Sequence, residues 1–272
     1  MSAGDQDWVP PEVDTRRANV ARVYDYLLGG THNFLADQDV ARAIIAVEPN
    51  ARGVGQANRA FLGRAVRYLA GAGIRQFLDV GSGIPTQANV HEVAQEAVPG
   101  AGVVYADIDP VAIAHSGAIL AGNPDTAGIE ADLRQPATVL DRAAGTGLID
   151  FSKPVGLLLL AVLHFIPDED DPWGIVATLR DALAPGSYLV LSHGTEEGAP
   201  DVAQAAEKVY QRAASAGLRM RSRPDIARFF DGFELVEPGL VAMPYWRPDP
   251  SGGLPVDQRK FWGGLAGVAR LS

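Results

Sequence analysis

The sequence predicts an α/β fold: a three-layer sandwich in which helices cover both faces of a seven-stranded, mostly parallel sheet with an antiparallel last strand. Three observations support this fold class. From residue 74 onward, short apolar runs alternate with helical stretches, the pattern typical of βαβ units. The chain has 272 residues, 47% of them hydrophobic, which suffices for one enlarged α/β domain. A Gly-Ser-Gly turn follows the first apolar run, at the sheet edge where open α/β sheets bind ligands.

The first 72 residues are predicted to form helices that precede the first strand. Three ranges carry apolar residues at helical spacing: Arg16–Leu28, Asp37–Val47 and Gln56–Ala70. Gly29 and Gly30 end the first helix, and Asp37 is the expected N-cap of the second. We expect residues 1–72 to form a helical cap packed on a Rossmann-like main domain of residues 73–272, not an independent domain.

The main domain is predicted to begin with five strands in βαβ order. The expected strands are Arg75–Val80, Gly102–Ile108, Ala127–Glu130, Pro154–Ala161 and Ser187–Ser192. The expected helices between them are Thr86–Ala97, Pro110–Leu120, Pro136–Ala144 and Pro172–Leu183. Three of these four helices start with proline, whose missing N–H is harmless at a helix start.

The C-terminal part is predicted to complete the sheet. Helices are expected over Asp201–Ala216 and Pro224–Phe230, followed by two strands in the apolar runs Phe233–Met243 and Phe261–Arg270. The segment 244–253 between these runs is rich in proline and glycine, so it predicts a loop or a hairpin excursion.

Composition excludes several function classes. The formal net charge of −10 disfavours nucleic acid and anionic membranes as partners. The chain has no cysteine, which removes disulfides, thiolate metal ligands and cysteine nucleophiles. No apolar run approaches the roughly 20 residues of a membrane span, and residues 1–14 resemble no signal peptide. A cytoplasmic protein without a metal site is therefore expected, and its oligomeric state stays open.

A cluster of acidic residues and glycines follows the first three predicted strands. Asp79-Val-Gly81-Ser82-Gly83 ends the first strand, Asp107 ends the second, and Asp132 follows the third. The glycines allow a tight turn close to a ligand, and a carboxylate after the second strand can accept hydrogen bonds from both hydroxyls of a ribose. An empty strand-to-helix turn is the alternative, but the three strands together favour a nucleotide site.

The details of the turn discriminate among nucleotides. The dinucleotide fingerprint requires a third glycine where this chain has Thr86, and no Walker A motif is present. An acid before the glycines, Asp79, would oppose a pyrophosphate but can face a cationic amino group. A ligand that combines a ribose, an adenine and an ammonium group fits this pattern.

These motifs resemble the first three motifs of class I S-adenosylmethionine-dependent methyltransferases. A closer likeness is to a bacterial family of S-adenosyl methyltransferases long known as a domain of unknown function, and it covers about residues 13–271. The segments that carry it start at Arg22 (RVYDYLLGGTHNF), Ala57 (ANRAFLGR), Pro85 (PTQANVHEV), Leu163 (LHFIPD) and Arg228 (RFFDG).

The resemblance implies S-adenosylmethionine as the cofactor and a role for each matching position. Asp79, Gly81, Ser82 and Gly83 would hold the methionine moiety, and Asp107 the ribose, with Ile108 against the adenine. Asp132 and Leu133 would contact the adenine edge and face, and Ala161 would begin the methyl-transfer site. Tyr24, Gly30 and Asn33 have no equivalent in the minimal class I fold and are expected to cover the cofactor or shape the acceptor pocket.

His164 is the candidate general base, because it follows the fourth strand and has a pKa suited to deprotonating a hydroxyl. A structural histidine bonded to a neighbouring loop is the alternative. Tyr24 belongs to the apolar stripe of the first helix, which favours core packing for this residue. Trp246 and Trp262 can either pack as a lid or line the acceptor pocket.

The predicted function is methyl transfer from S-adenosylmethionine to a small molecule, by O- or N-methylation. Base methylation is disfavoured, because cysteine and the Asn- or Asp-Pro-Pro-aromatic motif are both absent. The rivals are a non-catalytic S-adenosylmethionine-binding sensor or partner module, and an NAD-type oxidoreductase on a similar sheet.

Overall fold

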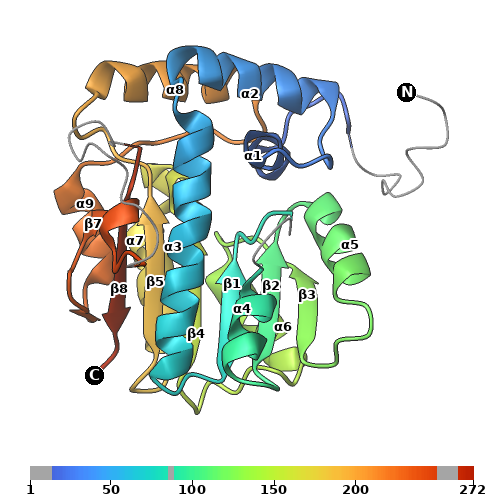
Figure 1. Ribbon diagram of the computed structural model, residues 1–272, viewed down its shortest axis with the longest axis vertical. Helices are drawn as coiled ribbons and strands as arrows, with labels where there is room; N and C mark the ends of the chain where they lie inside the picture. The colour runs from blue at the N-terminus through green and yellow to red at the C-terminus, as the bar shows by residue number, and fades with distance from the viewer. Residues whose placement is uncertain (1–13, 85–88, 250–262) are drawn as a thin grey trace.

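The computed structural model describes residues 14–84, 89–249 and 263–272 (Figure 1). Its sheet has eight strands in the order β3-β2-β1-β4-β5-β8-β6, with β7 also paired to β8. The first five strands are parallel to one another, and β8 is antiparallel to its neighbours β5, β6 and β7. The strands are β1 Gln76–Val80, β2 Gly102–Asp107, β3 Thr126–Glu130, β4 Gly156–Leu160, β5 Tyr188–His193, β6 Glu234–Leu235, β7 Val241–Ala242 and β8 Leu265–Arg270. The predicted fold class is confirmed.

Helices cover both faces of the sheet. Alternate residues of β4 show this: Leu157 and Leu159 belong to one apolar cluster, and Leu158 and Leu160 to the other. The first cluster includes α6 (Pro136–Gly145) and α7 (Pro172–Asp181), and the second includes α3 (Ala51–Gly71) and α4 (Val90–Ala97). The helix α5 (Pro110–Ile119) packs against β2 and β3.

A third apolar cluster lies above the carboxyl ends of the strands. It joins α1 (Val20–Leu28), α2 (Leu35–Val47) and α8 (Pro200–Ala213), so segments far apart in the chain share one core. Figure 1 shows α2 and α8 lying across the top of the molecule, with α3 running down from them along the sheet. The short helices are α9 Arg223–Ala227 and four 3₁₀ turns, η1 Leu163–Phe165, η2 Asp168–Asp170, η3 Arg228–Phe230 and η4 Met243–Tyr245.

Several predicted details need correction. The helix predicted over Arg16–Leu28 starts only at Val20, because Asn19 is its N-cap. Asp37 is not the N-cap of α2, because the helix starts at Leu35; its carboxylate instead accepts hydrogen bonds from the backbone N–H groups of Asn19 and Phe34. The helix α3 starts at Ala51, five residues before the predicted start at Gln56. The predicted strand Phe233–Met243 is two short strands, which raises the total from seven to eight.

The interruption has a local cause. Pro238 has no N–H to donate, and Gly239 has a φ of 82°, so the chain turns between β6 and β7. The N–H of Gly239 closes this turn on the carbonyl of Val236 at 2.8 Å. The predicted positions Thr86, Phe261 and Trp262 lie outside the described residues. Within the described ranges, no helix is both long enough and apolar enough to cross a membrane.

Candidate active site

The turn after β1 forms a cradle for a ligand. Gly81 and Gly83 have φ values of 73° and 65°, a region that favours glycine. A Cβ atom at Gly81 would also collide with the side chain of Val162, which follows β4. The hydroxyl of Ser82 is buried and has no hydrogen-bond partner among the residues described. An orphaned polar atom in a cradle that excludes side chains suits a polar ligand.

Two buried carboxylates flank this turn. Asp107 at the end of β2 accepts hydrogen bonds from the N–H groups of Gly83 at 2.7 Å and Asp109 at 2.9 Å. Burial nevertheless raises the pKa of Asp107 to about 6. Burial raises the pKa of Asp79 to about 7, against the opposing effect of the positive charge of Arg59. Both carboxylates would gain from a ligand that supplies hydrogen-bond donors or positive charge.

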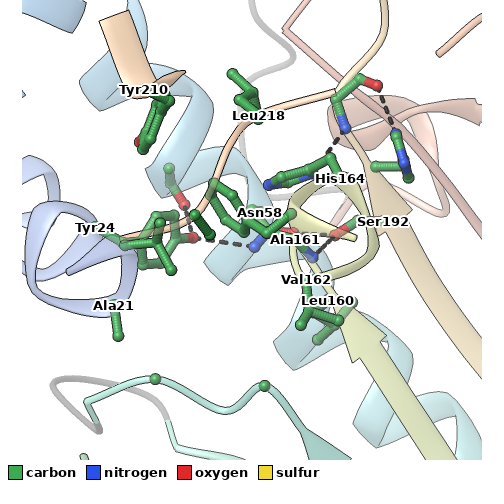
Figure 2. A pocket seen from close by; sticks show the side chains of 18 of the residues that line it. Ala21, Tyr24, Asn58, Leu160, Ala161, Val162, His164, Ser192, Tyr210 and Leu218 are labelled. Atoms are coloured by element: carbon green, nitrogen blue, oxygen red, sulfur yellow. Dashed lines mark hydrogen bonds between the residues drawn. The ribbon is translucent and has the colours of Figure 1, made fainter. Parts of the chain in front are cut away.

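A single cavity of about 500 Å³ extends from this turn to the N-terminal helices. One wall consists of the turn after β1 and the residues after β2 and β3. The opposite wall is mostly apolar and comes from α1, α2, α3, α8 and the turn before α9; it includes Leu27, Ile44, Leu62, Ala206, Tyr210, Leu218 and Met220. Figure 2 shows two of these residues, Tyr210 and Leu218. The carboxyl ends of β4 and β5 lie between the two walls. A polar, nucleotide-sized ligand and an apolar small molecule can therefore share one space.

A chain of hydrogen bonds connects the N-terminal helices to the end of β4 (Figure 2). The backbone N–H of Ala161 donates to the hydroxyl of Ser192 at 3.0 Å, and that hydroxyl donates to Asn58 Oδ1 at 2.6 Å. Asn58 Nδ2 donates to the Tyr24 hydroxyl at 3.0 Å, which donates to the carbonyl of Gly55. Ala161 has a φ of 54°, a strained value for a residue with a side chain, and this series of hydrogen bonds stabilises that conformation.

His164 lies in η1, just beyond Ala161, and its ring projects into the cavity (Figure 2). Its Nδ1 accepts a hydrogen bond from the N–H of Gly194 at 3.2 Å. Burial and the charge of Arg221 lower the pKa of His164 to about 3. His164 is therefore neutral at physiological pH.

The remaining predicted residues fall into two groups. Ile108, Asp132 and Leu133 line the cavity as expected. Burial works against the charge of Asp132, but hydrogen bonds from Arg134, one of them 2.6 Å long, hold the pKa of Asp132 below its ordinary value. Gly30 and Asn33 do not line the cavity.

Gly30 and Asn33 instead build a turn around the buried carboxylate of Asp25. Asn33 Nδ2 donates to Asp25 Oδ2 at 2.7 Å and to the carbonyl of Gly30 at 3.0 Å. A Cβ atom at Gly30 would collide with Asp25. Tyr24, by contrast, reaches the cavity. Trp246 is fully buried against Phe61 and Tyr68 and does not line the cavity.

Sequence reasoning missed several cavity residues. Asn58, Arg59, Glu48 and Ser192 all line the cavity, and none of them follows a strand that carries a glycine turn or an acidic residue. Asn58 and Arg59 do lie in one of the segments that carry the family resemblance, which was the available signal. Among the described residues, no group of histidine and carboxylate side chains is arranged to hold a metal ion.

Comparison with known protein families gives a match over residues 6–272 to the model of the S-adenosyl methyltransferase family. The chain belongs to this family. A comparison with curated proteins found no match. The family assignment and the fold together establish an S-adenosylmethionine-dependent methyltransferase whose cofactor is S-adenosylmethionine.

Two solved structures resemble this methyltransferase along nearly the whole chain. The crystal structure of a DUF574 family protein from Streptomyces avermitilis is 40% identical, with a TM-score of 0.90, and the match covers 95% of this chain and 99% of that one. A protein from Thermobifida fusca, described only provisionally as a methyltransferase, is 41% identical, with a TM-score of 0.90 and coverage of 98% and 99%. A methyltransferase from Anabaena variabilis, 15% identical with a TM-score of 0.50 over 72% of this chain and 77% of that one, shares the fold.

Proposed function

We propose that this enzyme methylates a small molecule that binds against the apolar wall of the cavity, by O- or N-transfer. The observation that carries the proposal is the cavity itself: a glycine turn with buried carboxylates and an apolar chamber meet at the ends of β1 and β4. These ends flank the point where the strand order reverses, which is where open α/β sheets bind their ligands.

The proposed roles of the cofactor-side residues follow from their contacts. Asp107 would accept hydrogen bonds from the ribose hydroxyls, and the Ser82 hydroxyl, which has no hydrogen-bond partner among the described residues, would bond the cofactor. Asp79 would face the ammonium group of the methionine moiety, and Arg59, whose charge acts on Asp79, would face its carboxylate. Ile108 and Leu133 would contact the adenine, with Asp132 at its edge.

The bound cofactor would supply a methyl group attached to a positively charged sulfur. An aligned nucleophile attacks this methyl carbon, and the sulfur leaves as a neutral thioether. The protein's contribution is therefore mainly proximity and orientation. The Ala161 turn, held by Ser192 and Asn58, would fix the wall beside the reacting atoms, and Tyr24 would anchor the cap to that wall. Closure by α1, α2 and α8 would exclude water from the transfer.

The experiment that tests this function compares cofactors and then acceptors. Calorimetric titration should show binding of S-adenosylmethionine and none of NAD; the reverse result would support the oxidoreductase alternative. A screen of apolar phenols, amines and carboxylic acids should then give S-adenosylhomocysteine as a product. Tight cofactor binding with no turnover across the whole screen would favour a non-catalytic sensor. A cytoplasmic location and the absence of a nucleic-acid partner stay predictions from the sequence.

A further inference from the structure

Beneath His164 lies a buried arginine with a complete set of partners. The Arg221 side chain is 3% exposed, and its Nη2 lies 2.7 Å from Asp168 Oδ1. It also donates to the carbonyls of Leu163 and Ile166. Its Nη1 lies 2.8 Å from Nε2 of His193. A guanidinium group can only donate hydrogen bonds, so Nε2 of His193 must carry the lone pair.

Two hydrogen bonds fix the protons on the two histidines: Arg221 determines the His193 tautomer, and the N–H of Gly194 determines that of His164. With its Nε2 accepting, the neutral His193 ring carries its proton on Nδ1, which donates to the carbonyl of Gly194 at 2.6 Å. The N–H of the same residue, Gly194, donates to Nδ1 of His164. Nδ1 of His164 is therefore an acceptor, and the proton of its neutral ring must be on Nε2.

We propose that His164 is a fixed hydrogen-bond donor to the methyl acceptor, and that the acceptor is an apolar molecule carrying a lone-pair oxygen, such as a carbonyl, beside the methylated atom. The proposal rests on the proposed function, because it assigns the acceptor to the apolar chamber. The His164 ring borders this chamber beside Phe165, and Met220 packs against Gly194. An N–H that faces such surroundings needs a hydrogen-bond acceptor from the ligand.

The same surroundings make His164 a poor base. A proton can enter the ring only at Nδ1, which is occupied by the Gly194 N–H, or after a tautomer change that breaks that bond. The charged and titratable groups nearby are Arg221, His193 and Asp168, and Arg221 opposes a second positive charge on His164. Burial and the neighbouring histidine likewise lower the pKa of His193. When the methylated atom must lose a proton, that proton goes to water or to another group.

Nitrogen NMR tests the tautomer without any acceptor. In the intact chain labelled with ¹⁵N-histidine, the five histidines give resolvable ring signals, and the spectrum of His164→Gln assigns those of His164. We expect a neutral ring with the proton on Nε2 at about pH 7, unchanged at about pH 5. A proton on Nδ1, or an imidazolium at about pH 6, would overturn the proposal. Binding of S-adenosylhomocysteine is measured separately, so failure of the cofactor site is recognised independently.

A matched pair of probes tests the ligand contact. Acetophenone and ethylbenzene have similar size, but only acetophenone has a carbonyl oxygen. In the S-adenosylhomocysteine complex with ¹³C-methyl methionine, Met220 and Met243 report entry into the chamber, because both line it. We expect both probes to shift a methionine signal, but only acetophenone to shift the Nε2–H of His164. Acetophenone that moves the Met220 signal and leaves His164 unchanged would refute the donor assignment.

Discussion

At the scale of single residues, the site is dominated by carboxylates that are buried before any ligand arrives. Asp79 and Asp107 are 5% and 6% exposed, and burial raises the pKa of both. The hydrogen bonds to Asp107 and the charge of Arg59 near Asp79 offset the energetic cost of burying these carboxylates only in part. Buried carboxylates of this kind stabilise the free protein poorly, which supports the proposal that they bind a ligand.

The first prediction concerns Asp107. Charge-assisted hydrogen bonds are worth roughly 1.5 to 3 kcal/mol each, and about 1.4 kcal/mol corresponds to a tenfold change in affinity. Asp107→Ala should therefore weaken S-adenosylmethionine binding by about 10- to 150-fold in calorimetric titration. Asp109→Ala is the control, because Asp109 caps α5 through the N–H of Val111 at 3.0 Å. The control should lower the melting temperature and leave affinity nearly unchanged; full affinity in Asp107→Ala would contradict the ribose assignment.

The second prediction concerns pH. The folded protein without cofactor keeps protons on Asp79 and Asp107 up to about pH 7 and about pH 6, whereas the unfolded chain releases them near the ordinary value of 3.8. These residues therefore lower the free energy of unfolding as pH rises through this window. Because the proposed roles of both residues require ionised carboxylates, cofactor affinity should rise by about 10- to 100-fold between about pH 5.5 and about pH 8.

Titrations of Asp79→Asn and Asp107→Asn provide the control for the pH effect. Each variant lacks one of the two ionisable groups, so its affinity should be lower and should depend less steeply on pH. Asp79→Asn should remove more of the pH dependence of affinity than Asp107→Asn does, because Asp79 has the higher pKa. A pH profile that is unchanged in both variants would show that other groups control binding.

At the scale of elements, a buried ion cluster attaches the N-terminal helices α1 and α2 to the start of α5. Arg22 of α1 is 4% exposed, and its Nε lies 3.6 Å from Asp37 of α2 and 3.8 Å from Asp109, the N-cap of α5. Burial raises the pKa of both carboxylates. One guanidinium group therefore compensates two acids from two separate elements.

The third prediction removes that compensation. Arg22→Leu should cost about 3 to 5 kcal/mol of the free energy of unfolding, because it leaves Asp37 and Asp109 buried without a cation. Arg42→Leu is the matched control: Arg42 pairs with Asp39 at 2.6 Å, but both side chains are more than half exposed. Its effect should stay within about 1 kcal/mol. Urea denaturation measures the free energy of unfolding of both variants. Equal losses would show that the buried ion cluster stabilises the fold no more than an exposed ion pair does.

At the scale of the whole molecule, α3 unites the cap and the sheet. Its buried residues Phe61, Val66 and Leu69 belong to the same apolar cluster as Phe77 of β1, while its start lines the cavity. The division into a cap of residues 1–72 and a main domain of residues 73–272 stays a prediction. We expect the two parts to unfold together, since separating them would expose this cluster.

The fourth prediction follows from this shared core. Thermal unfolding measured by circular dichroism and by tryptophan fluorescence should give one coincident transition, because Trp246 and Trp173 pack in the clusters on opposite faces of the sheet. S-adenosylmethionine at about 100 times its Kd should add about 2.7 kcal/mol and move that transition upward by about 5 to 10 °C. Two separate transitions, with only one moved by the cofactor, would mean that the cap is an independent unit.

Much of the proposed cofactor side of the site was predictable from the sequence. Asp79, Gly81, Gly83 and Asp107 lie at the ends of strands, and parallel strands bring their carboxyl ends to one sheet edge. Hydrophobic periodicity located these strands to within one or two residues. The strand predicted over Phe233–Met243 is divided by the turn at Gly239, and the apolar content of this segment gave no sign of that turn.

The sequence by itself determined the fold class, the glycine turn and the acids around it, because local spacing and strand order dictate them. Only the tertiary structure decided which residues meet on the opposite side of the cavity, where we propose that the methyl acceptor binds. Asn58 and Ser192 meet across 134 positions of the chain, and Arg221, from the segment before α9, contacts His193 at the end of β5. The tertiary structure also shows that Gly30 and Asn33 pack around Asp25 and do not line the cavity. Contacts of such long separation follow from how the helices pack over the strand ends, and no local pattern of residues encodes that packing.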